Sequence, residues 1–165
     1  VATWLSYTHD SDVARLIRRG KYNGRPDIFV ALGRLLAGRL AADGVLDGID
    51  ALIPVPMHWF RRMRRGYNQA ELLALAISRA SGIPLLRGAV RASRSRRHQA
   101  GSSRDVRAEN ARGRFRATRD LRGMHVAVVD DILTTGATVS GVIEALAPQS
   151  PRAISVITLA ATRYA

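Results

Sequence analysis

The carboxyl-terminal third of the sequence alternates between apolar runs and an amphipathic segment, and this alternation strongly constrains the fold. The run MHVAVVDD at 124–131 predicts a strand, GATVSGVIEALAPQS at 136–150 a helix, and RAISVITLAATR at 152–163 a further strand. A strand, a loop, a helix and another strand in this order form a parallel βαβ unit. The sequence therefore predicts an α/β fold with a mostly parallel central sheet flanked by helices.

The rest of the chain divides into similar elements. Amphipathic spacing with plausible capping residues predicts three more helices, at residues 10–19, 26–43 and 68–82. Short apolar runs predict strands at 49–56 and 83–90. The basic segments between them are expected to be loops, at 56–67 and 91–113, the second with a short helix near 103–110. We expect two units, a small helical hood at 1–48 and a core at 49–165.

The charge balance points to anionic ligands. The formal net charge is +13 over 165 residues, and nearly all of the positive charge is arginine, since Lys21 is the only lysine. The guanidinium fork suits phosphates, whether small phosphoesters or nucleic acid. No apolar run approaches the roughly 18 residues of a membrane span, so none is expected. The absence of cysteine makes a cytoplasmic location the default expectation.

Two adjacent acids end the strand predicted at 124–131, and small residues follow them. The segment from Thr134 to Thr138 allows backbone N–H groups and hydroxyls to approach an anion at a helix start, which describes a phosphate cradle. Asp130 and Asp131 would repel phosphate but suit sugar hydroxyls or Mg²⁺. Together they indicate a ribose 5-phosphate. The alternatives are an ordinary turn with a helix cap, or an acidic pocket that would need a further acid near an earlier strand end and a lysine at a later one.

The segment VAVVDDILTTGAT resembles the phosphoribosyl pyrophosphate (PRPP) signature of type I phosphoribosyltransferases. The resemblance implies the fold of these enzymes, with Mg²⁺ bound together with PRPP. It implies that Asp130 and Asp131 serve the ribose hydroxyls, and that Mg²⁺ is held through PRPP and not by a dedicated protein site, with Asp130 and Asp131 as the candidate contacts. The residues that would surround the 5-phosphate are Thr134, Thr135, Gly136, Ala137 and Thr138.

Three further segments resemble the ComF family of phosphoribosyltransferase-like proteins, named for competence in DNA uptake. They are RRGKYNGR at 18–25, PVPMHWFRRMRRGYNQAELLA at 54–74 and RRHQAGSSRDVRAENARGRF at 96–115. Many members carry a cysteine-rich, zinc-binding segment in front. This chain has no cysteine, so either this member does without that segment or the sequence begins after it.

The resemblance assigns roles to the two basic segments and to the hood. The candidates for pyrophosphate binding are Val55, Pro56, Met57, His58, Arg61 and Arg64. The candidates on a mobile flap that donates to the leaving group are Arg94, Arg97, Gln99 and Arg107. The hood offers three aromatic side chains for stacking on an acceptor base, with hood packing as the alternative: Tyr7, Tyr22 and Phe29.

Two functions follow from these residues. The first is a phosphoribosyltransferase that transfers phosphoribosyl from PRPP to a small nitrogen acceptor and releases pyrophosphate. The alternative is a non-catalytic accessory protein in DNA uptake, which senses PRPP or binds single-stranded DNA or a competence helicase. A homodimer is compatible with either. The acceptor cannot be read from the sequence.

Overall fold

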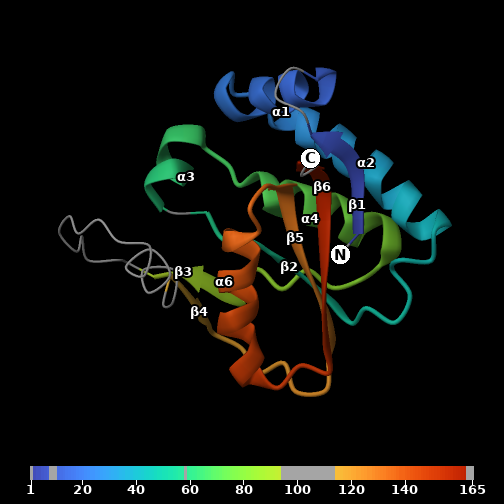
Figure 1. The fold of residues 1–165 in the computed structure, drawn as a ribbon, viewed down its shortest axis with the longest axis vertical. Coiled ribbons are helices and arrows are strands. Elements are labelled where there is room, and N and C mark those ends of the chain that lie inside the picture. Colours follow the sequence, from blue (N-terminus) through green and yellow to red (C-terminus); the bar gives the residue numbers. More distant parts are fainter. Residues whose placement is uncertain (1, 8–10, 58, 94–113, 163–165) are drawn as a thin grey trace.

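A computed structural model describes residues 2–7, 11–57, 59–93 and 114–162 of the chain. Its centre is a sheet of four strands, in the order β1 (Ala2–Tyr7), β6 (Ala153–Thr162), β5 (His125–Leu133) and β2 (Ala51–Pro54). All neighbouring strands run parallel, so their carboxyl ends lie at one edge of the sheet, and this edge faces the first helices (Figure 1). The predicted α/β fold with a parallel central sheet is confirmed.

Helices cover the sheet on both sides. Those in the described part of the chain are α1 (Asp12–Tyr22), α2 (Pro26–Ala42), α3 (Trp59–Arg65), α4 (Gln69–Ser81) and α6 (Ala137–Leu146). The described residues also form a short antiparallel pair, β3 (Val90–Ala92) with β4 (Phe115–Ala117), and a 3₁₀ turn at Ala147–Gln149. Within the described residues, no helix combines the length and the apolar character that crossing a bilayer requires.

The alternation of side chains along β5 divides the apolar core between the two faces. Ala127 and Val129 are buried against residues of α1, α2 and α4. Val126 and Val128 are buried on the opposite face, with residues of α6 and β3. Because side chains of a strand alternate with a period of two, Asp130 follows on the face of Val126 and Val128 and Asp131 on the face of Ala127 and Val129.

The predicted helices begin and end where their capping residues stand. The Ser11 hydroxyl accepts a hydrogen bond from the Ala14 N–H at 3.2 Å, Pro26 opens α2, and Asn68 caps α4. Gly82 ends α4 in the left-handed conformation, with φ 75°, which glycine adopts without steric cost. These local signals explain why the sequence located the three helices closely.

The structure differs from the sequence-based prediction in three places. Residues 59–65 form α3 where a loop was expected, because this basic stretch carries neither a capping signal nor an apolar stripe. The segment at 83–90 makes only one bridge, Leu85 with Leu52, and the strand β3 follows it. The short helix predicted near 103–110 lies outside the described residues.

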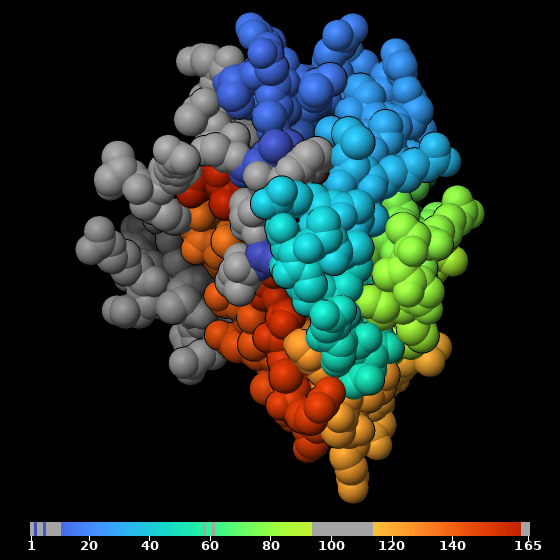
Figure 2. Space-filling model, turned by 90° about the vertical axis from the view of Figure 1, so that its right-hand side faces the viewer, coloured from blue at the N-terminus to red at the C-terminus, as the bar shows by residue number. Residues whose placement is uncertain are grey.

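The amino-terminal segment is joined closely to the rest of the molecule. Strand β1 pairs with β6 along the edge of the central sheet, although residues 1–48 were expected to form a helical hood. Ile17 and Phe29 of α1 and α2 share one buried cluster with Leu73 of α4. Figure 2 shows α1 and α2, in blue, at one end of the molecule and the orange and red carboxyl-terminal part toward the other. The boundary at residue 48 stays a prediction.

Candidate functional site

The two adjacent acids lie near the carboxyl end of β5. They are consecutive in the strand, so their side chains point to opposite faces of the sheet. Following the alternation of the strand, Asp130 points to the face covered by α6 and Asp131 to the face covered by α1 and α2. The Asp130 Oδ1 accepts a hydrogen bond from the Asp131 N–H at 2.8 Å. Because both acids lie near the carboxyl end of β5, they are at the edge where parallel α/β sheets bind their ligands.

Lys21 of α1 reaches across to this pair. Its Nζ lies 2.5 Å from Asp131 Oδ2, and the two side chains are only 18% and 12% exposed. The Lys21 ammonium is thus the ion-pair partner of a carboxylate that is largely buried. Sequence reasoning noted Lys21 as the single lysine but did not pair it with the acids, since 110 residues separate them in the chain.

Removal of the Lys21 ammonium should destabilise the protein. Lys21→Met leaves Asp131 without its cation in a largely buried position, so we expect the free energy of unfolding to fall by about 2 kcal/mol at pH 7. Lys21→Arg keeps the charge and should lose less. Urea denaturation of the wild type and both variants measures this order. Equal stability of Lys21→Met and the wild type would contradict the pairing.

The environment of the pair opposes two full negative charges. Burial, followed by the neighbouring charge of Asp131, raises the pKa of Asp130 to about 7. The Lys21 ammonium acts in the other direction on the same pKa but is the weaker influence. At neutral pH Asp130 is thus divided between its protonated and ionised forms, and a cationic or hydroxyl-bearing ligand would favour the ionised form.

This shift predicts a pH-dependent gain of stability in Asp130→Asn. The folded protein binds the Asp130 proton more tightly than the unfolded chain does, so the wild type loses stability as pH rises from about 4 to about 7. Asp130→Asn removes this loss, and we expect it to be more stable than the wild type by about 2 kcal/mol at pH 8. At pH 4 the difference should vanish. Urea denaturation across this range measures it, and a difference independent of pH would contradict it.

The loop after β5 is open to solvent and leads directly into α6. Thr134, Thr135 and Thr138 are exposed, and Gly136 occupies the left-handed region, with φ 76°, at the start of the helix. The first hydrogen bond of the helix runs from the Ser140 N–H to the Gly136 carbonyl at 2.8 Å. The preceding residues of the first turn, including Ala137, therefore have no carbonyl partner within the helix. An anion can approach this turn from solvent.

The segment that follows β2 begins at the same edge of the sheet. The Val55 N–H donates to the Val129 carbonyl at 2.9 Å, and Val55 is buried. This N–H cannot also donate to a ligand, so the predicted role of Val55 in pyrophosphate binding is wrong. The Val55 carbonyl accepts from the side-chain amide of Asn68 at 2.9 Å, which ties the segment to the start of α4.

The other predicted pyrophosphate residues separate into two groups. Pro56 and Met57 line a hollow of about 570 Å³ between α3 and β3, together with Arg62 and Arg91. Glu71 also lines it, and its carboxylate lies 3.6 Å from the Arg62 guanidinium, so the positive charge there is partly balanced. Arg61 and Arg64 belong to α3. Arg64 lines a different hollow, on the side of α3 that faces α1.

Several predicted residues lie outside the part of the chain that the structure describes. They are His58, and the four flap candidates Arg94, Arg97, Gln99 and Arg107. Strands β3 and β4, which precede and follow these residues in the chain, pair with each other, and the Ser93 N–H donates to the Arg114 carbonyl at 2.7 Å. The role of these residues stays a prediction.

The hood aromatics differ from one another in exposure. Phe29 is fully buried and its ring lies 6.4 Å from that of Tyr67, so it belongs to the core and cannot stack on a ligand. Tyr22, the last residue of α1, is 65% exposed. Of these two predicted stacking residues, only Tyr22 is accessible.

Sequence comparison relates the chain to proteins of known family. A family model described as phosphoribosyl transferase domain matches residues 13–164. The DNA utilization protein YhgH of Escherichia coli is 32% identical over 150 residues, which are 89% of this chain and 66% of that protein. Competence protein F of Haemophilus influenzae is 39% identical over 94 residues, which are 55% and 41%. The chain thus spans less than two thirds of the length of either relative.

Structural comparison agrees with the family match. The glutamine PRPP amidotransferase of Bacillus subtilis, solved with ADP and GMP, resembles the chain with a TM-score of 0.57 and 22% identity. The likeness covers 84% of this chain and 30% of the larger one. At this identity the likeness concerns the fold alone, and it agrees with the architecture expected from the segment at 126–138.

Proposed function

Since the chain belongs to the phosphoribosyltransferase domain family, as a ComF-type member, we propose that it binds PRPP and transfers the phosphoribosyl group to a nitrogen acceptor. One observation carries the proposal. Two acids at the end of β5 are followed by an exposed threonine and glycine loop that opens a helix. Carboxylates at this position accept from ribose hydroxyls, and the loop surrounds a phosphate.

Each part of the site has a role in this proposal. Asp130 and Asp131 bind the ribose hydroxyls and orient the ring. The first turn of α6 and the hydroxyls of Thr134, Thr135 and Thr138 bind the 5-phosphate. When pyrophosphate leaves, positive charge develops on the ribose ring, and an ionised Asp130 would stabilise it. The elevated pKa of Asp130 then makes PRPP binding stronger at pH 8 than at pH 6.

The acids also fit a divalent cation that arrives with PRPP. Among the described residues, no group of three or more His, Cys, Asp or Glu side chains could hold a metal alone. Carboxylate oxygens are ligands that Mg²⁺ accepts, and a cation already lies at Asp131, where the Lys21 Nζ is 2.5 Å from Oδ2. Bound Mg²⁺ would neutralise charge on the pyrophosphate. Asp130 and Asp131 would be the residues that help to hold the ion, together with oxygen atoms of PRPP.

Binding of single-stranded DNA is the second candidate function. The names of the two relatives refer to DNA utilization and to competence, and the net charge of +13 favours a polyanion. In this case the PRPP site would regulate the protein or be a remnant, and no transfer would occur.

Calorimetry with two ligands tests both functions. We expect PRPP with Mg²⁺ to bind the wild type, and pyrophosphate to be released when a panel of purines, pyrimidines and small amines is added. A short single-stranded oligonucleotide is titrated in parallel at two salt concentrations. If PRPP does not bind the wild type, the proposed function is wrong. If the oligonucleotide binds with a steep dependence on salt while PRPP is bound but never consumed, the accessory function is favoured.

A further inference from the structure

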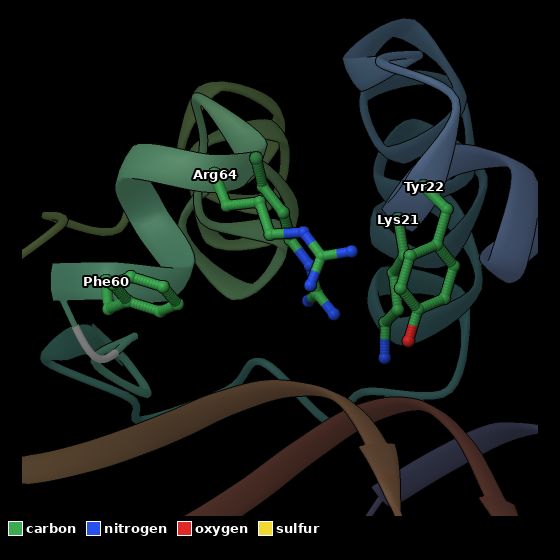
Figure 3. A pocket seen from close by; sticks show the side chains of 5 residues that line it. Lys21, Tyr22, Phe60 and Arg64 are labelled. Carbon is green, nitrogen blue, oxygen red and sulfur yellow. The ribbon is translucent and has the colours of Figure 1, made fainter.

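A hollow between α1 and α3 adjoins the acidic pair and has a lining of unusual composition. Its volume is about 570 Å³, within the range of small-molecule sites. The described residues that line it are Lys21, Tyr22, Phe60, Arg64 and Arg65. Figure 3 shows Arg64 extending from α3 toward Lys21 and Tyr22 of α1, with Phe60 on the α3 side of the space.

The charge of this lining is entirely positive. It holds three cations, and no acid lies among the described residues that line it. Lys21 is paired with Asp131, whereas Arg64 and Arg65 have no ion-pair partner among the described residues. Two guanidinium groups are thus directed at one space without a balancing charge, unlike the arginines near Glu71. Such a space favours an anionic group, which a guanidinium binds through two parallel hydrogen bonds.

The same hollow presents aromatic faces to solvent. Tyr22 and Phe60 are 65% and 61% exposed, although large apolar side chains are usually covered. The Arg65 guanidinium carbon lies 5.1 Å from the centre of the Tyr22 ring, close enough for a cation–π contact. Guanidinium and phenol planes of this kind are surfaces on which a flat ring can stack. A ligand that covers them would gain apolar contact as well as charge pairing.

Lys21 connects this hollow to the ribose site. Its side chain lines the hollow, and its Nζ lies 2.5 Å from Asp131 Oδ2. A molecule in the hollow is therefore next to the carboxylate that, under the proposed function, holds the ribose. We infer that the hollow is the acceptor site and that the acceptor is a planar nitrogen heterocycle bearing a carboxylate. This inference rests on the proposed function for its reaction, and on the hollow for its ligand class.

The transfer balances with this class of acceptor. The lone pair of a ring nitrogen forms the bond to the anomeric carbon of PRPP, the bond from that carbon to the pyrophosphate oxygen breaks, and pyrophosphate leaves with the electron pair. If the attacking nitrogen carries a proton, that proton goes to solvent. Arg64 and Arg65 bind the carboxylate and take no part in the bond changes, so they orient the acceptor.

Two matched pairs of compounds test the inference. Nicotinate and nicotinamide share a ring and differ in the charge of one substituent, as orotate and uracil differ by a carboxylate. We expect calorimetry to show each acid binding the wild type at least 10-fold more tightly than its neutral partner. The double variant Arg64→Gln/Arg65→Gln should abolish this preference, and Tyr22→Leu should weaken acids and neutral rings alike, by about 3-fold or more. Arg34→Gln, which removes an exposed arginine of α2 away from the hollow, should change nothing.

A PRPP titration separates the two proposals. Because Arg64 is itself a candidate for pyrophosphate binding, this titration uses Arg65→Gln. If the wild type binds PRPP and Arg65→Gln binds it within about 2-fold, the hollow is distinct from the PRPP site, as inferred. If PRPP binds but neither acid binds, or acids and neutral partners bind equally, the inference is overturned and the proposed function survives. A loss of PRPP binding in Arg65→Gln would assign the hollow to pyrophosphate instead. If an oligonucleotide binds far more tightly and displaces nicotinate and orotate, the hollow would be assigned to nucleic acid. Either result overturns the inference.

Discussion

Asp130→Asn/Asp131→Asn should weaken PRPP binding at least 100-fold. Each carboxylate can accept a charge-assisted hydrogen bond from ribose, worth about 1.5–3 kcal/mol, and amides in their place lose most of that strength. Two such losses exceed the roughly 2.7 kcal/mol that corresponds to a 100-fold change in affinity. Calorimetry with PRPP and Mg²⁺ at pH 8, where the wild-type Asp130 is ionised, measures the effect.

The matched control is Asp47→Asn. Asp47 is exposed and lies before β2, at the end of the strands opposite to the acidic pair. The Asp47→Asn variant should bind PRPP as the wild type does. Any general effect of lost negative charge would appear both in Asp47→Asn and in Asp130→Asn/Asp131→Asn. Affinity of the double variant within 10-fold of the wild type would show that the acids do not hold the ribose.

Gly33→Val should lower the free energy of unfolding by about 3 kcal/mol. Helices α2 and α4 approach so closely at this residue that a β-carbon on Gly33 would lie 2.7 Å from the Ala76 β-carbon and 3.3 Å from the Leu73 α-carbon. Neither of these atoms is the end of a flexible side chain. The helices must therefore separate, and the buried cluster that joins α2 to the core must open.

Gly38→Val is the control for this variant, because it places the same side chain in the same helix. A β-carbon on Gly38 would meet nothing within 4 Å. Since valine is a better helix former than glycine, we expect Gly38→Val to raise the free energy of unfolding by about 0.3 kcal/mol. Urea denaturation measures both changes. If the two variants lose equal stability, helix propensity and not the close approach governs Gly33.

The sequence located most of the elements because their signals are local. The apolar run of β5, the caps Ser11 and Asn68, and the glycine that ends α4 all act within a few residues. Strand β1 and helix α3 lack such signals. Residues 2–7 form a strand because they pair in parallel with β6 at the edge of the sheet. The pattern of residues within 2–7 does not predict this partner.

The candidate site divides in the same way. The order of strand, acids, small-residue loop and helix is contiguous, so the sequence alone predicted where the ribose and its phosphate would bind. Val55 shows the limit of such reasoning. The sequence suggested that the Val55 N–H could donate to a ligand. In the structure it donates to the Val129 carbonyl of the neighbouring strand β5. Backbone groups at a sheet edge can be assigned only when the strand order is known.

The sequence by itself determined that this protein is an α/β phosphoribosyltransferase-type domain with an acidic pair at a strand end. Only the tertiary structure decided what stands opposite that pair. Lys21 meets Asp131, and Tyr22 and Phe60 border one hollow with two arginines, because α1 and α3 converge over the same edge of the sheet. Contacts between residues so far apart in the chain arise from packing of the apolar helix faces, and no local periodicity encodes them.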